Sequence, residues 1–74
     1  MDDPLPQFGS NLRKARLARG LSQERLAHLC GLNMTHVARI ERAERESGIR
    51  TVSKLARGLD VRASVLFDGL EGRD

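Results

Sequence analysis

Few side chains in this sequence are of the types that catalyse reactions or bind metals. Cys30 is the only cysteine, so it has no partner for an internal disulfide and no second thiolate for a metal site. His28 and His36 share their helix faces with no cluster of Cys, Asp or Glu, whereas a metal site needs converging ligands. The serines and Gln23 lack a His–Asp arrangement for nucleophilic catalysis, and the glycines occur singly instead of in phosphate-binding loops. The sequence therefore predicts a protein that is not an enzyme and that uses no metal or cofactor.

Basic side chains are the chemistry that the sequence does supply, and they are concentrated in its middle. Residues 13–62 hold twelve Lys or Arg against five Asp or Glu, while each end carries a net charge of −2. A basic body of this kind favours a polyanionic partner, although the cations near residues 13–19 also suit a solvated helix face. Only Phe8 and Phe67 are aromatic, so the chain lacks the stacking side chains of single-strand binders. The composition therefore favours a polyanionic partner and argues against recognition by base stacking.

The length and hydropathy of the chain limit its class. Seventy-four residues make one domain near the lower size limit for folding without staples, so a second copy would add useful burial. No apolar run approaches the roughly 18 to 20 residues that span a bilayer. Met1 is followed by Asp2 and Asp3 instead of the basic start of a signal peptide. We expect a soluble, cytoplasmic protein without a membrane partner, in which Cys30 is reduced and buried.

Helical periodicity divides the chain into five short helices. Apolar side chains recur three and four residues apart, and nothing alternates with period two over a useful length, so no strands are expected. The predicted helices cover residues 8–19, 23–30, 34–42, 49–58 and 63–67. Together they make a compact all-α domain over residues 8–70. Residues 1–7, which include Pro4 and Pro6, are expected to form an extended arm, and residues 71–74 a tail.

Capping residues and apolar stripes support these boundaries. Ser22 and Asn33 are of the types that cap helix N-termini, and Gly20 and Gly31 are of the type that ends helices. Asp60 is a plausible turn residue after the fourth helix. Apolar side chains of the second and fourth helices are expected to point inward, namely Leu26, Leu29, Cys30, Ile49, Val52, Leu55, Ala56 and Leu59.

The spacing within Gln23–Arg42 is the strongest pattern in the chain. Two helices that cross steeply through a short turn need a small residue at their close approach and a turn residue that tolerates positive φ. Ala27 and Gly31 meet these two demands. Inward positions of the two helices are filled by Leu26, Cys30, Leu32, Val37 and Ile40. Each position alone is weak, but the set predicts a helix-turn-helix.

With these residues in place, the sequence resembles the lambda repressor–Cro (Xre) family of helix-turn-helix regulators. The resemblance extends from Phe8 to about Leu70. Its most specific segments are GLSQERLA at residues 20–27, ARIER at residues 38–42 and KLARGLDV at residues 54–61. Within that family the sequence is most similar to the controller proteins of restriction–modification systems. The resemblance implies a lambda-repressor-like fold in which the third helix lies in the major groove of DNA.

The resemblance also implies which side chains contact DNA. Base edges would be contacted by Met34, Thr35, His36 and Arg39. Phosphates would be contacted by Ser22, Gln23, Asn33, Arg42, Arg45 and Ser47, aided by backbone N–H groups at two helix N-termini.

The base contacts expected of Arg39, His36 and Met34 are not equally well supported by the sequence. Arg39 is a long donor on the exposed side of the third helix, between inward neighbours, which independently favours DNA contact. His36 is open to two interpretations, a DNA contact or plain exposure. Met34 departs from the family, because controller proteins often have Arg there and Met offers only apolar contact with a thymine methyl. Specificity would therefore depend on Thr35, His36 and Arg39, or on DNA shape.

Two further features are predicted, an ion pair implied by the family pattern and an apolar patch indicated by the residues near the C-terminus. Arg16 and Glu41 are expected to form a partly buried ion pair that orients the third helix without touching DNA. Near the C-terminus, Leu66 is expected to complete the core, while Val65, Phe67 and Leu70 would be exposed on a monomer and are candidates for a dimer interface. For Phe67 the alternative is packing against the first helix. A two-fold dimer would set two recognition helices roughly 34 Å apart, one turn of DNA.

The resulting functional prediction is a homodimeric transcription regulator that binds a palindromic or pseudo-palindromic operator. An antitoxin or a phage-type repressor that also binds a protein partner is the alternative, because the fold alone does not fix function. The chain has no room for a ligand-sensing domain, so no small-molecule ligand is expected. Activation would also require a contact with RNA polymerase, for which the sequence identifies no residue.

Overall fold

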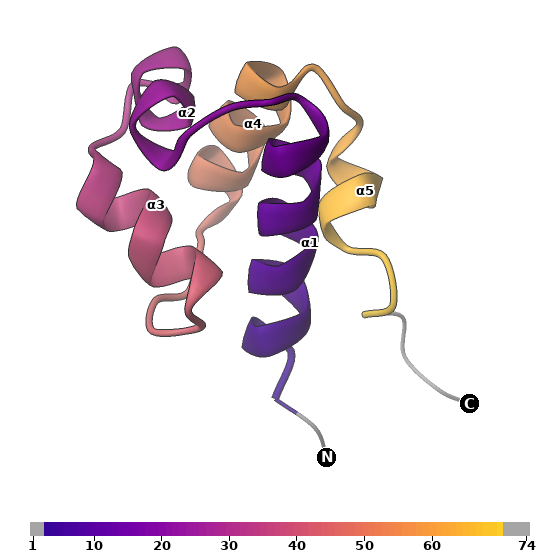
Figure 1. Ribbon diagram of the computed structural model, residues 1–74. Coiled ribbons are helices and arrows are strands. Elements are labelled where there is room, and N and C mark those ends of the chain that lie inside the picture. Colours follow the sequence, from indigo (N-terminus) through magenta and orange to yellow (C-terminus); the bar gives the residue numbers. More distant parts are fainter. Residues whose placement is uncertain (1–2, 71–74) are drawn as a thin grey trace.

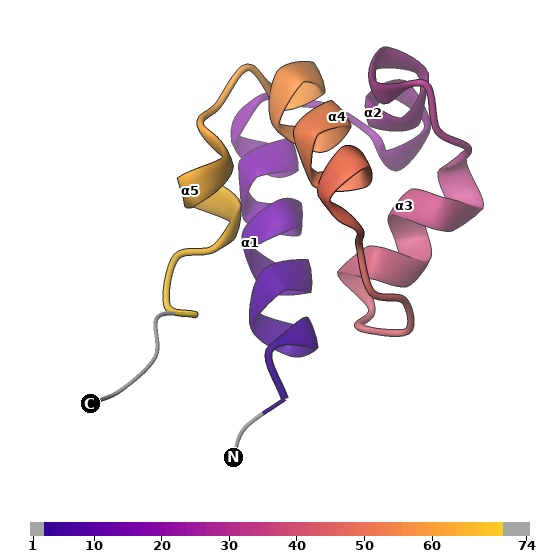
Figure 2. The ribbon, with the colours of Figure 1, turned by 180° about the vertical axis from the view of Figure 1, so that it is seen from behind.

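The longest helix, α1 (Leu5–Ala18), runs through the middle of the computed structural model, which describes residues 3–70 (Figure 1). The other helices are α2 (Gln23–Cys30), α3 (Met34–Glu41), α4 (Ile49–Leu59) and α5 (Ala63–Leu66). α2 and α3 lie on one side of α1 and α5 on the other, while α4 lies at the back in Figure 1 and at the front in the reverse view (Figure 2). The predicted all-α, five-helix fold is confirmed, and residues 3–70 contain no strand. None of the helices in this range has the length and apolar character that crossing a membrane requires.

The start of α1 differs from the sequence prediction. α1 begins at Leu5, three residues before the expected start at Phe8, so Leu5–Gln7 are helical instead of part of an extended arm. Proline is tolerated in a first helical turn, where its missing N–H would have had no partner; Pro6 occupies that turn, and Pro4 is the N-cap. The remaining arm residues Met1 and Asp2, and the predicted tail 71–74, lie outside the described residues.

The turns between the helices follow the predicted capping chemistry. Gly31 takes the left-handed conformation with φ 71°, and the N–H of Leu32 donates to the carbonyl of Ala27 at 2.9 Å, which closes α2 with a Schellman motif. α4 extends one residue beyond the predicted end at Gly58, and Asp60 then adopts φ 56° as its left-handed cap. These short turns therefore limit the angles between successive helices.

The core lies where α1, α2, α3, α4 and α5 converge. Its fully buried side chains come from every helix: Leu12, Leu26, Val37, Ile40, Leu55, Leu59 and Leu66. Ala27 and Cys30 are also buried, and Leu32 is half-buried against this cluster, so the inward positions predicted for the helix-turn-helix are confirmed. Leu66 fills the core as predicted, with no exposed surface. Because α2 and α3 share these buried residues with the rest of the domain, their relative angle is fixed by the core.

Two side chains predicted to point inward do not. Leu29 is 45% exposed and Ile49 is 88% exposed. Both lie at the periodic spacing of their helices, but periodicity identifies a face and does not reveal how far along the helix the core extends. Ile49 is the first residue of α4, and no element of residues 3–70 covers that turn. The core contacts of α4 therefore begin one turn later, at Val52.

Candidate nucleic-acid interface

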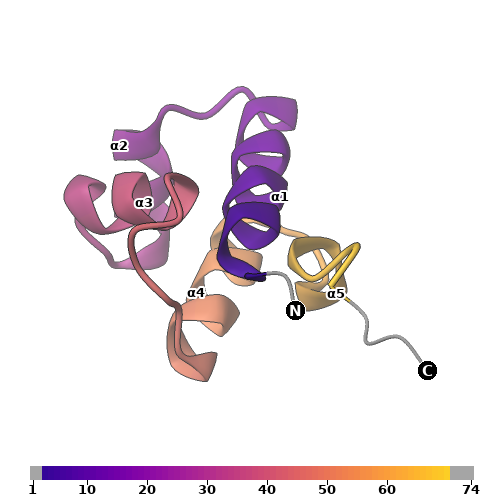
Figure 3. The same ribbon diagram turned by 90° about the horizontal axis from the view of Figure 1, so that it is seen from below.

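The exposed side of α3 presents four side chains, Met34, Thr35, His36 and Arg39, which we call the recognition face. Met34 is half exposed, and Thr35 and Arg39 are also exposed, while His36 is partly covered. On the opposite side of α3, Val37 and Ile40 are buried in the core. α3 lies at one edge of the molecule (Figures 1 and 3).

Side-chain caps hold the N-termini of α2 and α3. Ser22 Oγ accepts a hydrogen bond from the N–H of Arg25 at 2.9 Å, and Asn33 Oδ1 accepts one from the N–H of His36 at 2.8 Å. Each cap uses an acceptor of the side chain, so the hydroxyl hydrogen of Ser22 and the amide hydrogens of Asn33 are the groups left to donate outward. These caps start both helices with free N–H groups pointing away from the core, an arrangement suited to phosphate oxygens.

A buried polar network joins α1, α2 and α3. Arg16 Nε lies 2.7 Å from Glu41 Oε2 and its Nη2 lies 3.1 Å from Oε1, a two-pronged ion pair whose side chains are 9% and 4% exposed. Arg16 Nη1 also donates to the carbonyl of Leu21 at 2.8 Å. Gln23 Nε2 donates to Glu41 Oε1 at 3.0 Å. The amide of Gln23 therefore orients the buried carboxylate, a role that the sequence analysis did not assign to this expected phosphate contact.

The connection between α3 and α4 carries the remaining expected phosphate contacts. Arg42 is exposed and pairs with Glu44, at 3.2 Å between Arg42 Nη2 and Glu44 Oε1. Arg45 is exposed and makes no ion pair with any residue of the described range. Ser47 is half-buried, and its Oγ is covered without a hydrogen-bond partner among residues 3–70. These three side chains thus differ in how free they are of other contacts within residues 3–70, and Arg45 is the freest of them.

His36 is surrounded by positive charge. Partial burial lowers the pKa of its imidazole below the ordinary value, and the nearby cations of Arg45 and Lys54 lower this pKa further. Arg45 belongs to the loop after α3, and Lys54 lies on the exposed side of α4. Two elements, the loop after α3 and α4, therefore bring basic groups to the edge of the recognition face. Lys54 was not among the residues expected from the sequence, and its proximity depends on how α4 packs.

Gly9 is a second residue that the sequence analysis missed. A Cβ at this position of α1 would lie 2.6 Å from the carbonyl oxygen of Ile40 and 2.7 Å from that of Glu41. Both atoms belong to the backbone at the C-terminal end of α3, so α1 approaches α3 too closely for any side chain here. A glycine inside a helix costs helix stability and often marks such an approach, which is the signal that could have identified it.

Arg19 is exposed, as expected of a solvated helix face, but it also bonds to another helix. Its Nε donates to the carbonyl of Leu59 at 2.7 Å, and its Nη2 lies 3.0 Å from Asp60 Oδ2. Arg19 therefore fastens the end of α1 to the end of α4. No group of three or more His, Cys, Asp or Glu side chains gathers in metal-binding geometry within residues 3–70.

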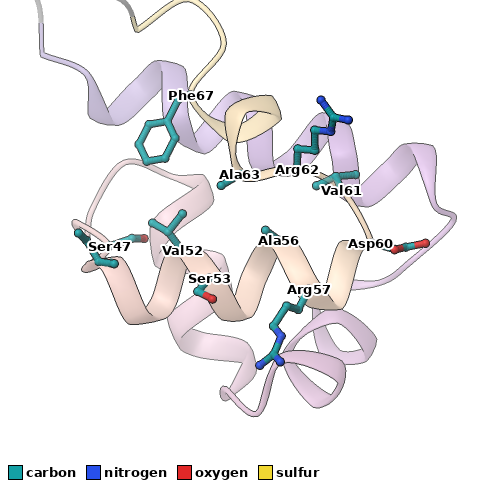
Figure 4. A pocket seen from close by; sticks show the side chains of 11 residues that line it. Ser47, Val52, Ser53, Ala56, Arg57, Asp60, Val61, Arg62, Ala63 and Phe67 are labelled. Atoms are coloured by element: carbon teal, nitrogen blue, oxygen red, sulfur yellow. The ribbon is translucent and has the colours of Figure 1, made fainter.

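An apolar groove lies on a different side of the molecule, between α4 and α5, and we call it the α4–α5 groove (Figure 4). Its volume is about 870 Å³. The small side chains of Ala56 and Ala63 face it from the two helices, and Phe67 lies at one end (Figure 4). Ile49 also lines it, and Phe67 and Val65 are 45% and 43% exposed. Such a concentration of uncovered apolar surface is typical of a protein interface.

Phe67 is both packed and exposed. Its ring centroid lies 5.4 Å from that of Phe8 on α1, with the rings tilted by 57°. The contact with the first helix and the exposure to the groove, which the sequence analysis held as alternatives, thus coexist. Leu70 is half-buried and packs against the core cluster, so less of it is available to a partner than of Phe67.

Comparison with known proteins decides the family. The model of the HTH_3 helix-turn-helix family matches residues 12–66, which include all of α2, α3 and α4. The chain belongs to this family. The predicted resemblance to Xre-type regulators is confirmed, and the chain is a DNA-binding transcription regulator.

Several relatives of this family member are restriction–modification controllers. Control protein C.BamHI of Bacillus amyloliquefaciens is 36% identical over 62 residues, which cover 82% of this chain and 76% of the relative. Control protein C.MunI of a Mycoplasma species is 33% identical over 72 residues, or 96% and 97% of the two chains. The controller C.AhdI from Aeromonas hydrophila is 44% identical in sequence to this chain. Its crystal structure matches this chain with a TM-score of 0.83, and the match covers 85% of this chain and 96% of that one. The similarity to controller proteins is therefore confirmed in both sequence and structure.

Proposed function

We propose that this regulator is a controller protein of a restriction–modification system, which binds a palindromic or pseudo-palindromic operator as a homodimer. Relatives named as controllers match nearly the full length of the chain, which supports this proposal. It would act in the cytoplasm, where the DNA is, without catalysis, a cofactor or a small-molecule ligand. Its occupancy of the operator would then depend on protein concentration, and dimerisation coupled to binding would make that dependence steep.

The recognition face is the observation that carries the DNA-binding part of the proposal. α3 exposes a surface with hydrogen-bond donors while its other side is fixed in the core, as insertion into a major groove requires. In this proposal Arg39 donates to base acceptors, and Thr35 and His36 supply further polar contacts. Met34 contributes apolar contact only, with a thymine methyl as its partner of choice.

Phosphate contacts would surround the recognition face. Ser22 and Asn33 would donate from the capped ends of α2 and α3, and Arg45 would donate from the loop after α3. Arg42 would exchange its pairing with Glu44 for a phosphate. We retain Gln23 and Ser47 as weaker candidates, since Gln23 already donates to Glu41 and the Oγ of Ser47 is covered.

The α4–α5 groove is the proposed surface for the second copy. Phe67, which the sequence analysis expected at a dimer interface, lines this groove, and so does the uncovered Ile49 of α4. Val65, the second such candidate, is exposed on α5 but does not line the groove. In a two-fold dimer the side chain of Ile49 from one protomer would enter the space beside Ala56 and Ala63 of the other. Leu70 would contribute at the margin, because it is half-buried already.

The proposal is tested by titrating the protein against operator-containing and random duplex DNA at several salt concentrations. Arg39→Ala is expected to remove about 1–3 kcal/mol of the preference for operator DNA, because it removes a base contact. Arg45→Ala is expected to weaken binding to both duplexes alike and to reduce the salt slope by about one, because it removes a phosphate contact.

Lys14→Gln is the matched control, since Lys14 is an exposed cation on α1, a helix that contributes no residue to the recognition face. Equal effects of Arg39→Ala and Arg45→Ala on the two duplexes would contradict the assignment of base contacts. Weak binding that is insensitive to salt and sequence would contradict the regulator proposal and favour a protein partner instead.

A further inference from the structure

Asn11 is a buried amide on α1 whose hydrogen bonds reach the other end of the chain. Asn11 is 7% exposed and is one of two buried polar or charged residues in the described range. Asn11 Nδ2 donates to the carbonyl of Leu66 at 2.9 Å and to the carbonyl of Asp68 at 2.8 Å. Asn11 Oδ1 accepts from Gln7 Nε2 at 2.9 Å. Since backbone carbonyls only accept hydrogen bonds, the amide of Asn11 can satisfy both of them in one orientation alone.

The segment that Asn11 holds cannot support itself. α5 has four residues, and a helix of one turn is unstable without tertiary contacts. Leu66 anchors it through apolar burial. The carbonyls of Leu66 and Asp68 lie at the C-terminal end of α5, where no further turn of helix supplies N–H groups to them. Asn11 supplies the missing donors to both.

Phe67 lies between the two carbonyls that Asn11 binds. Its backbone is therefore fixed on both sides by one side chain of α1, while its ring packs against Phe8, one turn earlier on the same helix. What remains of the ring faces the α4–α5 groove (Figure 4). α1 contributes nothing to the lining of the groove, yet it determines where the aromatic end of the groove lies.

We propose that Asn11 is a positioning residue for dimerisation: it fixes the place of Phe67 and thereby the shape of the surface that the second copy contacts. This inference rests on the proposed homodimer. Asn11 contacts neither DNA nor the partner in it, and acts through Phe67. Gln7 has a secondary part, because its bond to Oδ1 keeps the amide of Asn11 turned toward the two carbonyls.

Asn11→Asp is the sharpest test, because the side chain keeps its shape while two donors become acceptors that face two carbonyl oxygens. The aromatic NMR spectrum holds only two Phe and two His, so the Phe8–Phe67 ring contact is observable as a resolved NOE. We expect Asn11→Asp to lose this NOE while the amide signals of α2 and α3 keep their dispersion. We expect its dimer dissociation constant, measured by analytical ultracentrifugation, to rise by about tenfold or more.

Two comparisons separate positioning from a general loss of stability. Lys14→Gln makes the same change in net charge on the same helix from an exposed position, and we expect it to leave the NOE and the dissociation constant unchanged. In a Phe67→Ala background, adding Asn11→Asp is expected to weaken the dimer no further, because the residue through which Asn11 acts is gone. Additive effects of the two substitutions would overturn the inference.

A second variant decides the question if Asn11→Asp does not fold. Gln7→Ala removes one bond of an exposed side chain, and we expect a weakening of the dimer of about two- to fivefold with a diminished NOE. A wild-type NOE and dissociation constant in either folded variant would overturn the inference. A wild-type chain that stays monomeric at all concentrations would instead contradict the proposed dimer, and the NOE would still report whether Asn11 positions Phe67.

Discussion

The recognition face and the α4–α5 groove are both exposed, but they are built in opposite ways. The recognition face carries polar and basic side chains on a helix whose other side is fixed by buried residues and a buried ion pair. The groove carries uncovered apolar side chains, and one of its walls is a helix of a single turn held by Asn11. The recognition face is therefore held in place by the core before a partner binds. The groove has one wall, α4, that packs in the core, and another, α5, whose position depends on contacts with distant residues.

The two surfaces should therefore respond to different kinds of substitution. Substitutions that disturb the recognition face indirectly should act through the core beneath α3, and they should lower the stability of the whole domain. Substitutions of the exposed side chains that line the groove, such as Ile49, should leave the monomer folded and change association alone. The predictions below test this separation, in decreasing order of expected effect.

Glu41→Ala is expected to have the largest effect. It leaves the guanidinium of Arg16 buried without its carboxylate, which should lower the free energy of unfolding by about 3–5 kcal/mol. Urea denaturation followed by circular dichroism measures this loss. Gln23→Ala removes only one hydrogen bond to the same carboxylate and should cost about 1 kcal/mol. A loss below 1 kcal/mol for Glu41→Ala would show that the ion pair does not hold α3.

Gly9→Ala should come next, because its Cβ meets two backbone oxygens of α3 that cannot move independently of the core. We expect a loss of about 1–3 kcal/mol in stability, together with weaker operator binding, as α3 is pushed outward. Gly48→Ala is the matched control, since a Cβ there meets nothing within 4 Å and φ is −75°. If the two glycine variants have equal melting temperatures, the close approach of α1 to α3 is not rigid.

Ile49→Glu tests the other half of the comparison. Ile49 is 88% exposed, and an acidic residue is favourable in the first turn of a helix, so the monomer should keep its stability within about 0.5 kcal/mol. The dimer should dissociate at about tenfold higher concentration or more, because a charge would have to be desolvated in the interface. Sedimentation velocity over a concentration series provides the measurement.

Leu17→Glu is its control, since Leu17 is 52% exposed on α1 and does not line the groove. Equal weakening by Leu17→Glu and Ile49→Glu would place the interface elsewhere than the α4–α5 groove.

The smallest expected effect concerns His36. The cations of Arg45 and Lys54, together with partial burial, lower its pKa in the folded state, so the unfolded chain binds this proton more readily. Stability should therefore be complete above the ordinary histidine pKa of about 6.5 and fall slightly as the pH drops toward the lowered value. NMR titration of the imidazole gives the folded-state pKa, and His36→Gln should flatten this part of the stability profile. Bound DNA should raise the pKa, because phosphates oppose the two cations.

The helix-turn-helix was predictable because its signals are local. Each signal involves only residues that are close in sequence: the N-caps Ser22 and Asn33, the glycine at position 31, and buried apolar residues every three or four positions. The structure contains all of them. The start of α1 was missed because proline is compatible with both an extended arm and a first helical turn. Leu29 and Ile49 were misplaced because periodicity cannot show where a covering element ends.

The expected site residues divide in a similar way. Arg39 and the other members of the recognition face are expected to be accessible from their positions on one helix, and they are. Gln23 illustrates the limit, because its donation to Glu41 joins residues 18 apart in sequence. Lys54 and Gly9 escaped notice because their importance depends on which helix lies opposite them.

The number of helices, the N-caps of α2 and α3, the buried side of α3 and the basic character of its surroundings could all be predicted, because each depends on residues a few positions apart. Three features could be seen only once the chain was folded: which end of α4 stays uncovered, how close α1 comes to α3, and that Asn11 holds Phe67 from 56 residues away. These features depend on helix angles and on contacts between distant segments, which are set by the whole core at once and leave no pattern in any one stretch of chain.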